Sequence, residues 1–436
     1  MSQDAMNEPD TTRDTVGVVA DDLTGAGDCV VQFARAGWRS HLALGQALPA
    51  GERTAVAVVT DARPLDDDDA ARATADAVRS LASAGSQRLY VKIDSTMRGS
   101  VAGQVAGALA AWRDQVPGAF AVVCPSYPAL RRTVSGGVLL VDGAPVATTA
   151  AGHDPVTPVQ DSDLTTLLPG SVLVSADGDA RTLALRLAEA GEVAGTVVVD
   201  AVEDTDLEHL ADAVALLGAL AVPVGSAGLA GALAPRWNGG GERPEPPRVA
   251  VDRALVVLSS LNEVSREQAD ELLRAEPGTQ VLVPDPAVGA HEAVTSWLAG
   301  LGPGTRPVTV LVRTPEPDPE PAAKPTARPA PAGRERAAQA ADALAELVAA
   351  VTARTHPDAI VLIGGDGARA VLARLGARSV QVAGSVAEGV PLGHLEGGPS
   401  DGTVVVTKAG GFGTPRTVVD VLANLRSYCS HQEVNP

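Results

Sequence analysis

Short apolar runs alternate along the chain with longer stretches in which apolar residues recur at helical spacing. Continuously apolar runs are typical of strands buried on both faces of a parallel sheet. The stretches between them follow the i, i+3, i+4 pattern of a helix, as at residues 70–84 and 182–190. The alternation predicts an α/β fold with a mainly parallel sheet. The candidate strands are residues 16–20, 55–59, 88–91, 120–123, 171–174, 196–199, 254–258, 279–283, 308–312, 359–363, 380–382 and 404–406.

A change of composition divides this pattern in two. The sequence PRWNGGGERPEPP at residues 235–247 is rich in Gly and Pro and has no periodicity, so we place a linker at 237–250. We expect a disordered N-terminus at 1–14 and two domains, 15–236 and 251–428, each a mainly parallel sheet flanked by helices. The active site is then expected in the interdomain cleft. Residues 314–333 (TPEPDPEPAAKPTARPAPAG) predict a mobile, extended insertion in the second domain.

Composition and charge narrow the class of protein. Hydrophobic residues make up 45% of the 436 residues, which is enough for a sizeable core. A net charge of −19 without a basic run disfavours binding to nucleic acid or to an anionic membrane surface. The longest uncharged stretch, residues 213–235, contains Pro223 and four glycines. It predicts a helix, a short strand and a turn rather than a membrane span.

The cysteines and histidines indicate neither a disulfide framework nor a zinc site. Cys29, Cys124 and Cys429 are far apart, and no Cys/His cluster occurs. The first residues are polar and acidic, unlike a signal peptide. We therefore expect a cytoplasmic protein.

Polar residues that a fold alone does not need follow the first predicted strand, in VVADDLTGAGD at residues 18–28. The strand leads directly into Asp21 and Asp22, and Thr24 with the next glycines opens a helix. Free N–H groups and the dipole of a glycine-rich helix start favour an anion. Two carboxylates at the same position can accept a proton or hold Mg²⁺. Helix capping accounts for one of these carboxylates but not for both.

A second strand ends in a cluster of charge, in LYVKIDSTMRG at residues 89–99. The polar residues of this cluster are Lys92, Asp94, Ser95, Thr96 and Arg98. The whole chain has three lysines, and two of them, Lys92 and Lys408, stand at strand ends close to glycines. Because a compact ammonium and a guanidinium fork are not interchangeable, we assign these two lysines to the chemistry of a site.

Two further glycine-rich strand ends lie in the second half, AIVLIGGDGARA at residues 359–370 and VVVTKAGGFG at 404–413. Gly364 and Gly365 permit the close backbone approach that nucleotide phosphates require. Either loop alone is equally well explained as a turn, but together they predict a nucleotide site between them. Ser259 and Ser260, at another strand end, can bind phosphate oxygens or cap the next helix.

Taken in order, these motifs resemble the four-carbon acid sugar kinase family over residues 18–422. DDLTGAGD resembles the family's D-D-x-T-G-A-x-D, TDARPL at 60–65 is similar to its T-x-S-R element, and KIDSTMRG is an intact match. VGSAGLA at 224–230, GGDGARAVL, GSVAEGVPLG at 384–393 and TKAGGFG complete the collinear set. The resemblance implies an ATP- and Mg²⁺-dependent kinase acting on a hydroxyl of a small sugar acid, such as a tetronate or 3-oxo-tetronate.

The resemblance also implies that the first domain holds the acid and the second holds the nucleotide. Phosphoryl transfer needs alignment and charge neutralisation, so Lys92 and Arg98 are expected to pair with the substrate carboxylate. Either Asp22 or Asp94 would accept the hydroxyl proton. Mg²⁺ would bridge the phosphates, with Asp366 and water as ligands. The candidate acid-binding residues are Asp21, Asp22, Thr24, Arg63, Lys92, Asp94, Ser95 and Arg98, and the candidate nucleotide-binding residues are Ser260, Gly364, Gly365, Asp366, Gly367, Lys408 and Gly410.

The chain departs from the family pattern at several places in the nucleotide half. Ser259 replaces the middle glycine of S-G-S, and Gly367 replaces a threonine. This chain has GSVAEGVP where the family has G-E-V-A-P-G-V-P, so a carboxylate is lost at Ser385. Residues 414–416 stand where the family has an acidic residue. These departures motivate the alternative of a sugar-acid-binding protein of the same fold with lost or altered ATP turnover.

Two other interpretations are weaker. DLTGAGD also looks like the D-T-x-G-A-G-D of ribokinase-like kinases, where the last Asp is the base, but there it lies near the C-terminus. This likeness retains Asp28 as a third candidate base, although its place inside the helix favours a solvated face. A dinucleotide-dependent dehydrogenase lacks the required G-x-G-x-x-G after the first strand. The oligomeric state stays open, with a homodimer as one prediction.

Overall fold

The computed structural model describes residues 15–49, 51–154, 156–237, 251–285, 287–301, 307–315 and 331–427. The side chains of residues 331–334 and 366 are outside this description. Our predictions for residues 1–14, for nearly all of the linker and for most of the insertion therefore lie outside the described residues. The end of the predicted insertion, residues 331–333, belongs to a helix.

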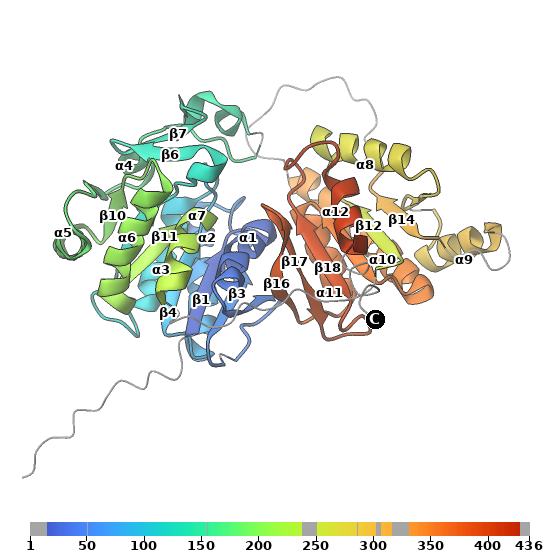
Figure 1. The fold of residues 1–436 in the computed structure, drawn as a ribbon, viewed down its shortest axis with the longest axis horizontal. Coiled ribbons are helices and arrows are strands. Elements are labelled where there is room, and N and C mark those ends of the chain that lie inside the picture. Colours follow the sequence, from blue (N-terminus) through green and yellow to red (C-terminus); the bar gives the residue numbers. More distant parts are fainter. Residues whose placement is uncertain are drawn as a thin grey trace, which may run out of the picture.

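One sheet of 15 strands runs through both halves of the described chain, with the two halves side by side (Figure 1). Its order is β13-β14-β12-β15-β18-β17-β16-β2-β3-β1-β4-β11-β5-β10-β9. These strands are β1 (Thr15–Ala20), β2 (Arg39–Ala43), β3 (Thr54–Val59), β4 (Arg88–Lys92), β5 (Phe120–Cys124), β9 (Val172–Val174), β10 (Thr196–Val199), β11 (Ala221–Gly225), β12 (Ala254–Leu258), β13 (Gln280–Leu282), β14 (Thr309–Arg313), β15 (Ala359–Ile363), β16 (Ser379–Ala387), β17 (Val390–Glu396) and β18 (Val404–Lys408). A second, small antiparallel sheet contains β6 (Arg132–Ser135), β7 (Val138–Val141) and β8 (Ala144–Pro145).

Helices cover both faces of the large sheet, as the alternating sequence pattern predicts. The helices are α1 (Leu23–Arg35), α2 (Asp67–Ser83), α3 (Val101–Trp112), α4 (Leu164–Leu167), α5 (Ala180–Ala194), α6 (Asp204–Leu217), α7 (Ala227–Trp237), α8 (Glu263–Ala275), α9 (Ala290–Gly300), α10 (Pro331–Thr355), α11 (Gly365–Arg374) and α12 (Thr417–Ser427), with short 3₁₀ turns at Pro128–Leu130, Val146–Thr148, Ala150–His153 and Gly218–Leu220. None of the helices in the described residues is both long and apolar enough to cross a membrane.

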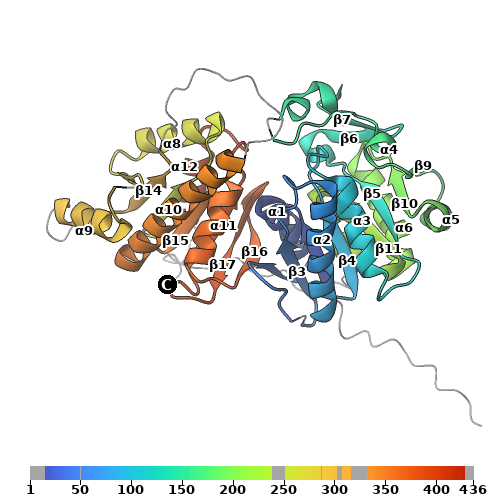
Figure 2. The same ribbon diagram turned by 180° about the vertical axis from the view of Figure 1, so that it is seen from behind.

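The two halves are joined directly through their sheets. Strand β16 pairs antiparallel with β2, with Ser40 opposite Val382 and Leu42 opposite Val380. Helix α1 and strand β16 lie beside each other at the centre of both views (Figure 1 and Figure 2). One hydrophobic cluster is continuous across this junction, because it contains buried residues of α1 and β2 together with residues of β16 and α11.

The predicted fold class is confirmed: the protein is α/β, and the sheet is mainly parallel in each half and flanked by helices. The predicted strands match observed ones to within one or two residues at most ends. Strands β2, β17 and β6–β8 were not predicted. Since β2 has the mixed sequence RSHLA, it lacks the apolar run on which the other predictions rest. The pairing that joins the two halves was missed for this reason.

Candidate active site

The acid-binding candidates gather at one edge of the sheet in the N-terminal half. Strands β3, β1 and β4 are parallel neighbours, so their carboxyl ends meet at this edge. Asp21 follows β1 directly, Arg63 lies in the loop after β3, and Lys92 is the last residue of β4. Residues far apart in the sequence thus form one cluster, as expected for ligand sites in open α/β sheets.

Arg63 is the centre of this cluster. Its Nε and Nη2 atoms donate to the two carboxylate oxygens of Asp21 at 2.8 and 2.9 Å. Its Nη1 atom lies 2.9 Å from Oδ2 of Asp22, and its Nη2 lies 3.7 Å from Oδ2 of Asp94. One guanidinium therefore holds carboxylates from two strand ends in fixed positions, which a lysine could not do.

Asp94 is fully committed to neighbouring donors. Arg98 donates to it through Nη2 at 2.7 Å and through Nε at 3.2 Å, and Thr96 donates through its backbone N–H at 2.9 Å and through its hydroxyl. Burial alone would raise the pKa of Asp94, but Arg63 and Arg98 hold it well below its usual range. Arg98 also donates to Asp154 at 3.2 Å. Asp94 is therefore a permanently charged anchor for two arginines.

Lys92 lies against the first turn of α1. Asp22 is the N-cap of this helix and accepts from Gly25 N at 2.7 Å. A Cβ on Gly25 would lie 2.7 Å from Nζ of Lys92, so only glycine admits the ammonium here. Nζ donates to the carbonyl of Ile93 at 2.8 Å, and the structure records no carboxylate within ion-pair distance of it among the described residues. Since an ammonium has three donors, Lys92 retains hydrogen-bonding capacity for a ligand.

The nucleotide-binding candidates form a second cluster, at the carboxyl ends of β12, β15 and β18, which are also parallel neighbours. Gly364 is the N-cap of α11 with φ of +105°, a conformation that favours glycine. A Cβ on Gly364 would lie 2.5 Å from Oγ of Ser259, and one on Gly410 would lie 2.0 Å from Oγ of Ser260. The backbone of each glycine loop therefore packs directly against a serine side chain. The start of α11, which these loops surround, has free N–H groups that suit a phosphate.

Lys408 holds the last glycine loop through hydrogen bonds to its backbone carbonyls. The side chain is 2% exposed, and its Nζ donates to the carbonyls of Ala409 at 2.6 Å and Phe412 at 2.7 Å, with Gly410 O at 3.4 Å. Burial lowers the pKa of Lys408 to about 8. The sequence predicted that this lysine contacts the nucleotide, and the structure directs its ammonium to its own loop.

The two clusters approach each other across α1. A Cβ on Gly365, the first residue of α11, would lie 3.8 Å from Oγ1 of Thr24. Arg369 of α11 forms an ion pair with Asp61 of the loop after β3. The start of α11 therefore lies next to the start of α1, and the two groups of candidates lie near each other between the halves.

A small pocket of about 60 Å³ lies between the halves beside this site. Its lining residues are Asp28, Val31, Gln32, Tyr127 and Leu130 from the first half and Glu388, Gly389, Ala409 and Phe412 from the second. Asp28 was expected on a solvated face, but it is half-buried between the halves, and its Oδ1 atom is buried without a hydrogen-bond partner among the described residues. The second half covers the helix face that α1 alone would leave in water.

Some residues of the site were not predicted. Asp154, which pairs with Arg98, stands in a loop whose sequence carries no recognisable signal. Tyr127 donates its hydroxyl to Glu388, which also pairs with Arg35 at 3.1 Å, and these contacts link the two halves. Ser95 is partly exposed within the acid cluster. The side chain of Asp366, the predicted metal ligand, lies outside the description.

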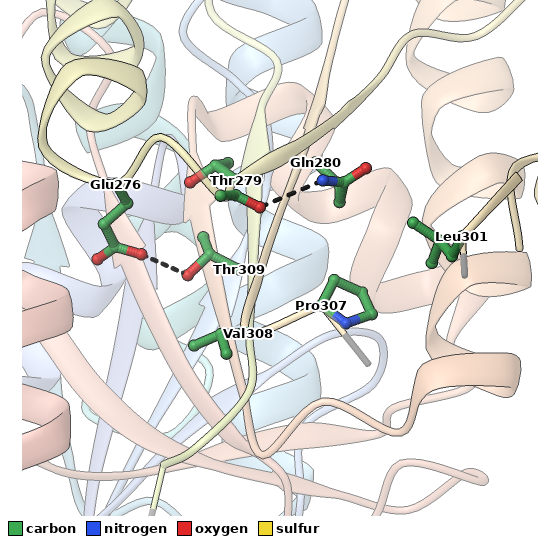
Figure 3. Close-up of a pocket in the computed structure, with 8 residues that line it drawn as sticks. Glu276, Thr279, Gln280, Leu301, Pro307, Val308 and Thr309 are labelled. Atoms are coloured by element: carbon green, nitrogen blue, oxygen red, sulfur yellow. Dashed lines mark hydrogen bonds between the residues drawn. The ribbon is translucent and has the colours of Figure 1, made fainter. Parts of the chain in front are cut away.

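Another pocket, of about 230 Å³, lies in the second half, and Figure 3 shows the residues that line it. Its lining includes Gln280 and Thr309, the first residues of β13 and β14, so it sits at the amino ends of these strands. Ligands of open α/β sheets bind at the opposite edge. The carboxylate of Glu276, which lines this pocket, accepts hydrogen bonds from Thr309 at 2.6 Å and from Arg426 at 2.6 Å. We therefore do not assign the active site to this pocket.

The side chains fit a nucleotide better than a protein-bound metal. The described residues contain no group of three or more His, Cys, Asp or Glu side chains that could hold a metal ion. Mg²⁺ commonly keeps several waters and is bound through substrate phosphates with one or two carboxylates. A metal in this site would therefore be carried mainly by the phosphates of ATP.

The protein has two halves, and each carries a cluster of candidate residues at the carboxyl ends of its parallel strands. Comparison with known proteins agrees: a family described as "Sugar-binding N-terminal domain" matches residues 16–233, and "Nucleotide-binding C-terminal domain" matches 255–418. A D-threonate kinase of Bordetella bronchiseptica is 42% identical over 94% of this chain and 97% of its own length. The chain belongs to the four-carbon acid sugar kinase family.

Two further relatives extend the comparison. A 3-oxo-tetronate kinase of Methylobacterium radiotolerans is 30% identical over 91% of this chain and 96% of its own length. The crystal structure of Haemophilus influenzae protein HI1011 is 22% identical, covers 95% of this chain and 99% of that one, and has a TM-score of 0.69. The last of these establishes that the fold is shared.

Proposed function

We propose that this protein is an ATP-dependent kinase that phosphorylates a hydroxyl of a four-carbon sugar acid, with D-threonate as the first substrate to test. Family membership supports a phosphotransferase, and the 42% identity with a D-threonate kinase over nearly the whole chain supports this acid over 3-oxo-tetronate. The observation that carries the proposal is the approach of Thr24 to Gly365, because it brings the acid cluster and the start of α11 into one site.

We assign the substrate carboxylate to Lys92 first. Arg63 and Arg98 are already engaged by Asp21, Asp22, Asp94 and Asp154, whereas Lys92 donates to a backbone carbonyl and retains donors. Arg98 is the more exposed of the two arginines, at 33% of its side chain against 19% for Arg63. It is therefore the second candidate for the substrate carboxylate. Asp21 and Asp94 act as positioning residues for Arg63 and Arg98.

We place the ATP phosphates at the first turn of α11, where the backbone N–H groups and the helix dipole favour negative charge. Gly364, Gly365 and Gly367 keep side chains away from this turn, and Ser260 with Gly410 forms the neighbouring wall. When bound, Mg²⁺ neutralises phosphate charge and orients the γ-phosphoryl group. The acceptor hydroxyl must also be aligned, and the fixed cluster around Arg63 supplies this alignment.

The alternative of a binding protein without turnover rested on the altered nucleotide motifs. Nothing in the comparisons favours it, and the altered positions still form packed loops at the strand ends. We further propose a cytoplasmic location, where ATP is available. The predicted homodimer remains a prediction, to be checked by light scattering during gel filtration.

A coupled ADP-release assay with ATP and Mg²⁺ tests the proposed function. The panel contains D-threonate, L-threonate, D-erythronate and 3-oxo-tetronates, with glycerate as a shorter control. We expect ADP release that depends on a four-carbon acid and is fastest with D-threonate. Calorimetric binding of an acid of the panel without ATP binding and without ADP release would favour the binding-protein alternative.

A further inference from the structure

Phosphoryl transfer to a hydroxyl requires a group that accepts the hydroxyl proton, and most carboxylates of the site are already occupied. Asp21 accepts both of its hydrogen bonds from Arg63. Asp22 caps α1 and pairs with Arg63, and Asp94 accepts from Thr96 and Arg98. A carboxylate held by this many donors is a poor proton acceptor, because protonation would break charge-assisted hydrogen bonds.

Two further carboxylates of the described residues, Asp154 of the outer loop and Glu388 of the second half, are occupied in the same way. Asp154 accepts from two backbone N–H groups and from Arg98. Glu388 accepts from the hydroxyl of Tyr127 and from Arg35. Asp28 differs, since its Oδ1 is buried and has no hydrogen-bond partner among the described residues. A buried oxygen in this state can accept a proton without losing an existing partner.

The position of Asp28 on α1 directs it to the reacting groups. Thr24 and Asp28 are four residues apart and therefore lie on the same face of the helix. Thr24 meets the start of α11, and Asp28 lines the pocket with Ala409 and Phe412 of the last glycine loop. This face of α1 thus looks toward both glycine loops.

The ammonium of Lys92, the last residue of β4, lies against the first turn of α1. It lies beside Gly25, three residues before Asp28. Among the nearby charges, Lys92 has the largest effect on the pKa of Asp28, which it lowers. A substrate held by Lys92 would therefore have its other end within reach of Asp28. The pocket at Asp28, about 60 Å³, admits groups of the size of a water molecule or a hydroxyl but not a whole sugar acid.

We propose that Asp28 is the general base of the kinase reaction, an inference that rests on the proposed function. The hydroxyl oxygen of the acid forms a bond to the γ-phosphorus of ATP, and the bond from that phosphorus to the β–γ bridging oxygen breaks. The electron pair of the broken bond leaves on ADP, and the hydroxyl proton passes to Oδ1 of Asp28. Asp28 returns the proton to solvent after the products leave.

Charged groups from several elements act on Asp28. Burial is the largest effect and raises the pKa of Asp28 to about 7, with Lys92 of β4 opposing it. Asp22 of α1 and Glu388 of the β16–β17 turn raise this pKa further, while Arg35 of α1 lowers it. Tyr127 of the loop after β5 keeps its proton, because burial and Glu388 raise the pKa of its hydroxyl. A carboxyl group with a pKa of about 7 can exchange a proton near neutral pH.

The first test replaces Asp28 by asparagine, which preserves shape and removes the base. We expect kcat with the best acid of the panel to fall about 10²–10⁴-fold. Calorimetric affinities for ATP and for the acid should stay within about threefold of wild type. Asp270→Asn, on the exposed surface of α8, is the matched control and should keep the wild-type kcat. An Asp28→Asn enzyme with kcat within about threefold of wild type overturns the proposal.

The second test is a pH profile, which a purely structural role of Asp28 would not change. In wild type, kcat should rise with pH through an inflection near the pKa of Asp28. Glu388→Gln removes a like charge, so the inflection should move to lower pH; this variant also serves if Asp28→Asn does not fold. An inflection that stays in place in Glu388→Gln, or persists in Asp28→Asn, contradicts the role.

The activity of wild type distinguishes a failure of the base assignment from a failure of the proposed function. Suppose that wild type phosphorylates an acid while Asp28→Asn keeps a kcat near that of wild type, or while the pH inflection stays in place in Glu388→Gln. In that case the base assignment fails and the proposed function stands. If wild type releases no ADP with any acid, the proposed function fails and the base assignment falls with it.

Discussion

Gly367 and Ser259 share one space: a Cβ on Gly367 would lie 2.1 Å from Cβ of Ser259 and 2.4 Å from its Oγ. Both positions depart from the family pattern, one from glycine to serine and the other from threonine to glycine. We infer that the two changes compensate, because the side chain of Ser259 occupies the space that a side chain at 367 would need. The hydroxyl of Ser259 donates to Ile363 O at 2.9 Å and so ties the strand ends together. The nucleotide loop therefore keeps its packing despite both departures.

This relationship predicts a rescue experiment. Gly367→Thr alone should clash with Ser259 and cost about 1–3 kcal/mol of stability, the usual range for overpacking. We expect a raised KM for ATP with little change in the KM for the acid. Adding Ser259→Gly should restore most of the lost ATP affinity in the double variant. Additive losses in the double variant would contradict the compensation.

Lys92→Met should raise the KM for the acid about 10- to 100-fold, since a hydrogen bond to a charged group is worth about 1.5–3 kcal/mol. The protein should stay folded, because the change removes a buried charge that the structure pairs with a carbonyl rather than with a carboxylate. Lys92→Arg should not rescue, as a guanidinium is too large beside Gly25. Steady-state kinetics and thermal unfolding check both points, and an unchanged KM in Lys92→Met would refute the assignment of the substrate carboxylate.

The affinity for ATP should weaken above about pH 8 through Lys408. Only the protonated amine can donate to all the carbonyls that it holds in the loop, and burial lowers its pKa to about 8. The KM for ATP should therefore rise in wild type as the pH passes from 7 to 9. In Lys408→Met it should be high and independent of pH over this range. A flat wild-type profile up to pH 9 would exclude this role for Lys408.

The Asp28 carboxylate should cost stability at neutral and alkaline pH. Burial raises the pKa of Asp28 from its ordinary value of 3.8 to about 7 in the folded protein, so its stabilising contribution is present below pH 3.8 and is lost as the pH rises through 7. A difference of about three pH units corresponds to at most about 4 kcal/mol. Asp28→Asn should accordingly be more stable than wild type at pH 8, and this advantage should disappear near pH 4. Urea unfolding at both pH values measures it, and a loss of stability at pH 8 would contradict the burial of a charged Asp28.

The parts of the fold that follow from local sequence were predicted correctly. Runs such as those of β1 and β15 are apolar throughout because both faces of the strand are covered, and this is visible in the sequence alone. The clusters of Asp21, Lys92 and Asp94 were predicted because the carboxyl ends of parallel strands meet. The sequence indicates such neighbours without any knowledge of contacts between the halves.

Part of what was missed depends on contacts between the two halves. The pairing of β2 with β16 cannot be inferred from RSHLA, and the burial of Asp28 comes from residues more than 350 positions later in the chain. The loss of a carboxylate at Ser385 is a further case. Arg35 contacts Oγ of Ser385 at 2.7 Å and Glu388 at 3.1 Å, so a carboxylate three residues further on supplies the charge. A motif compared one position at a time does not reveal such exchanges.

The central claim is transfer of a phosphoryl group from ATP to a four-carbon acid in the site between the halves. Its most direct measurement is mass spectrometry and ³¹P NMR of the product formed from D-threonate, ATP and Mg²⁺, with ADP quantified in the same sample. We predict one phosphorylated acid, a phosphomonoester, for each ADP formed. ADP formed without a phosphorylated acid, or neither product with any four-carbon acid, would contradict the claim.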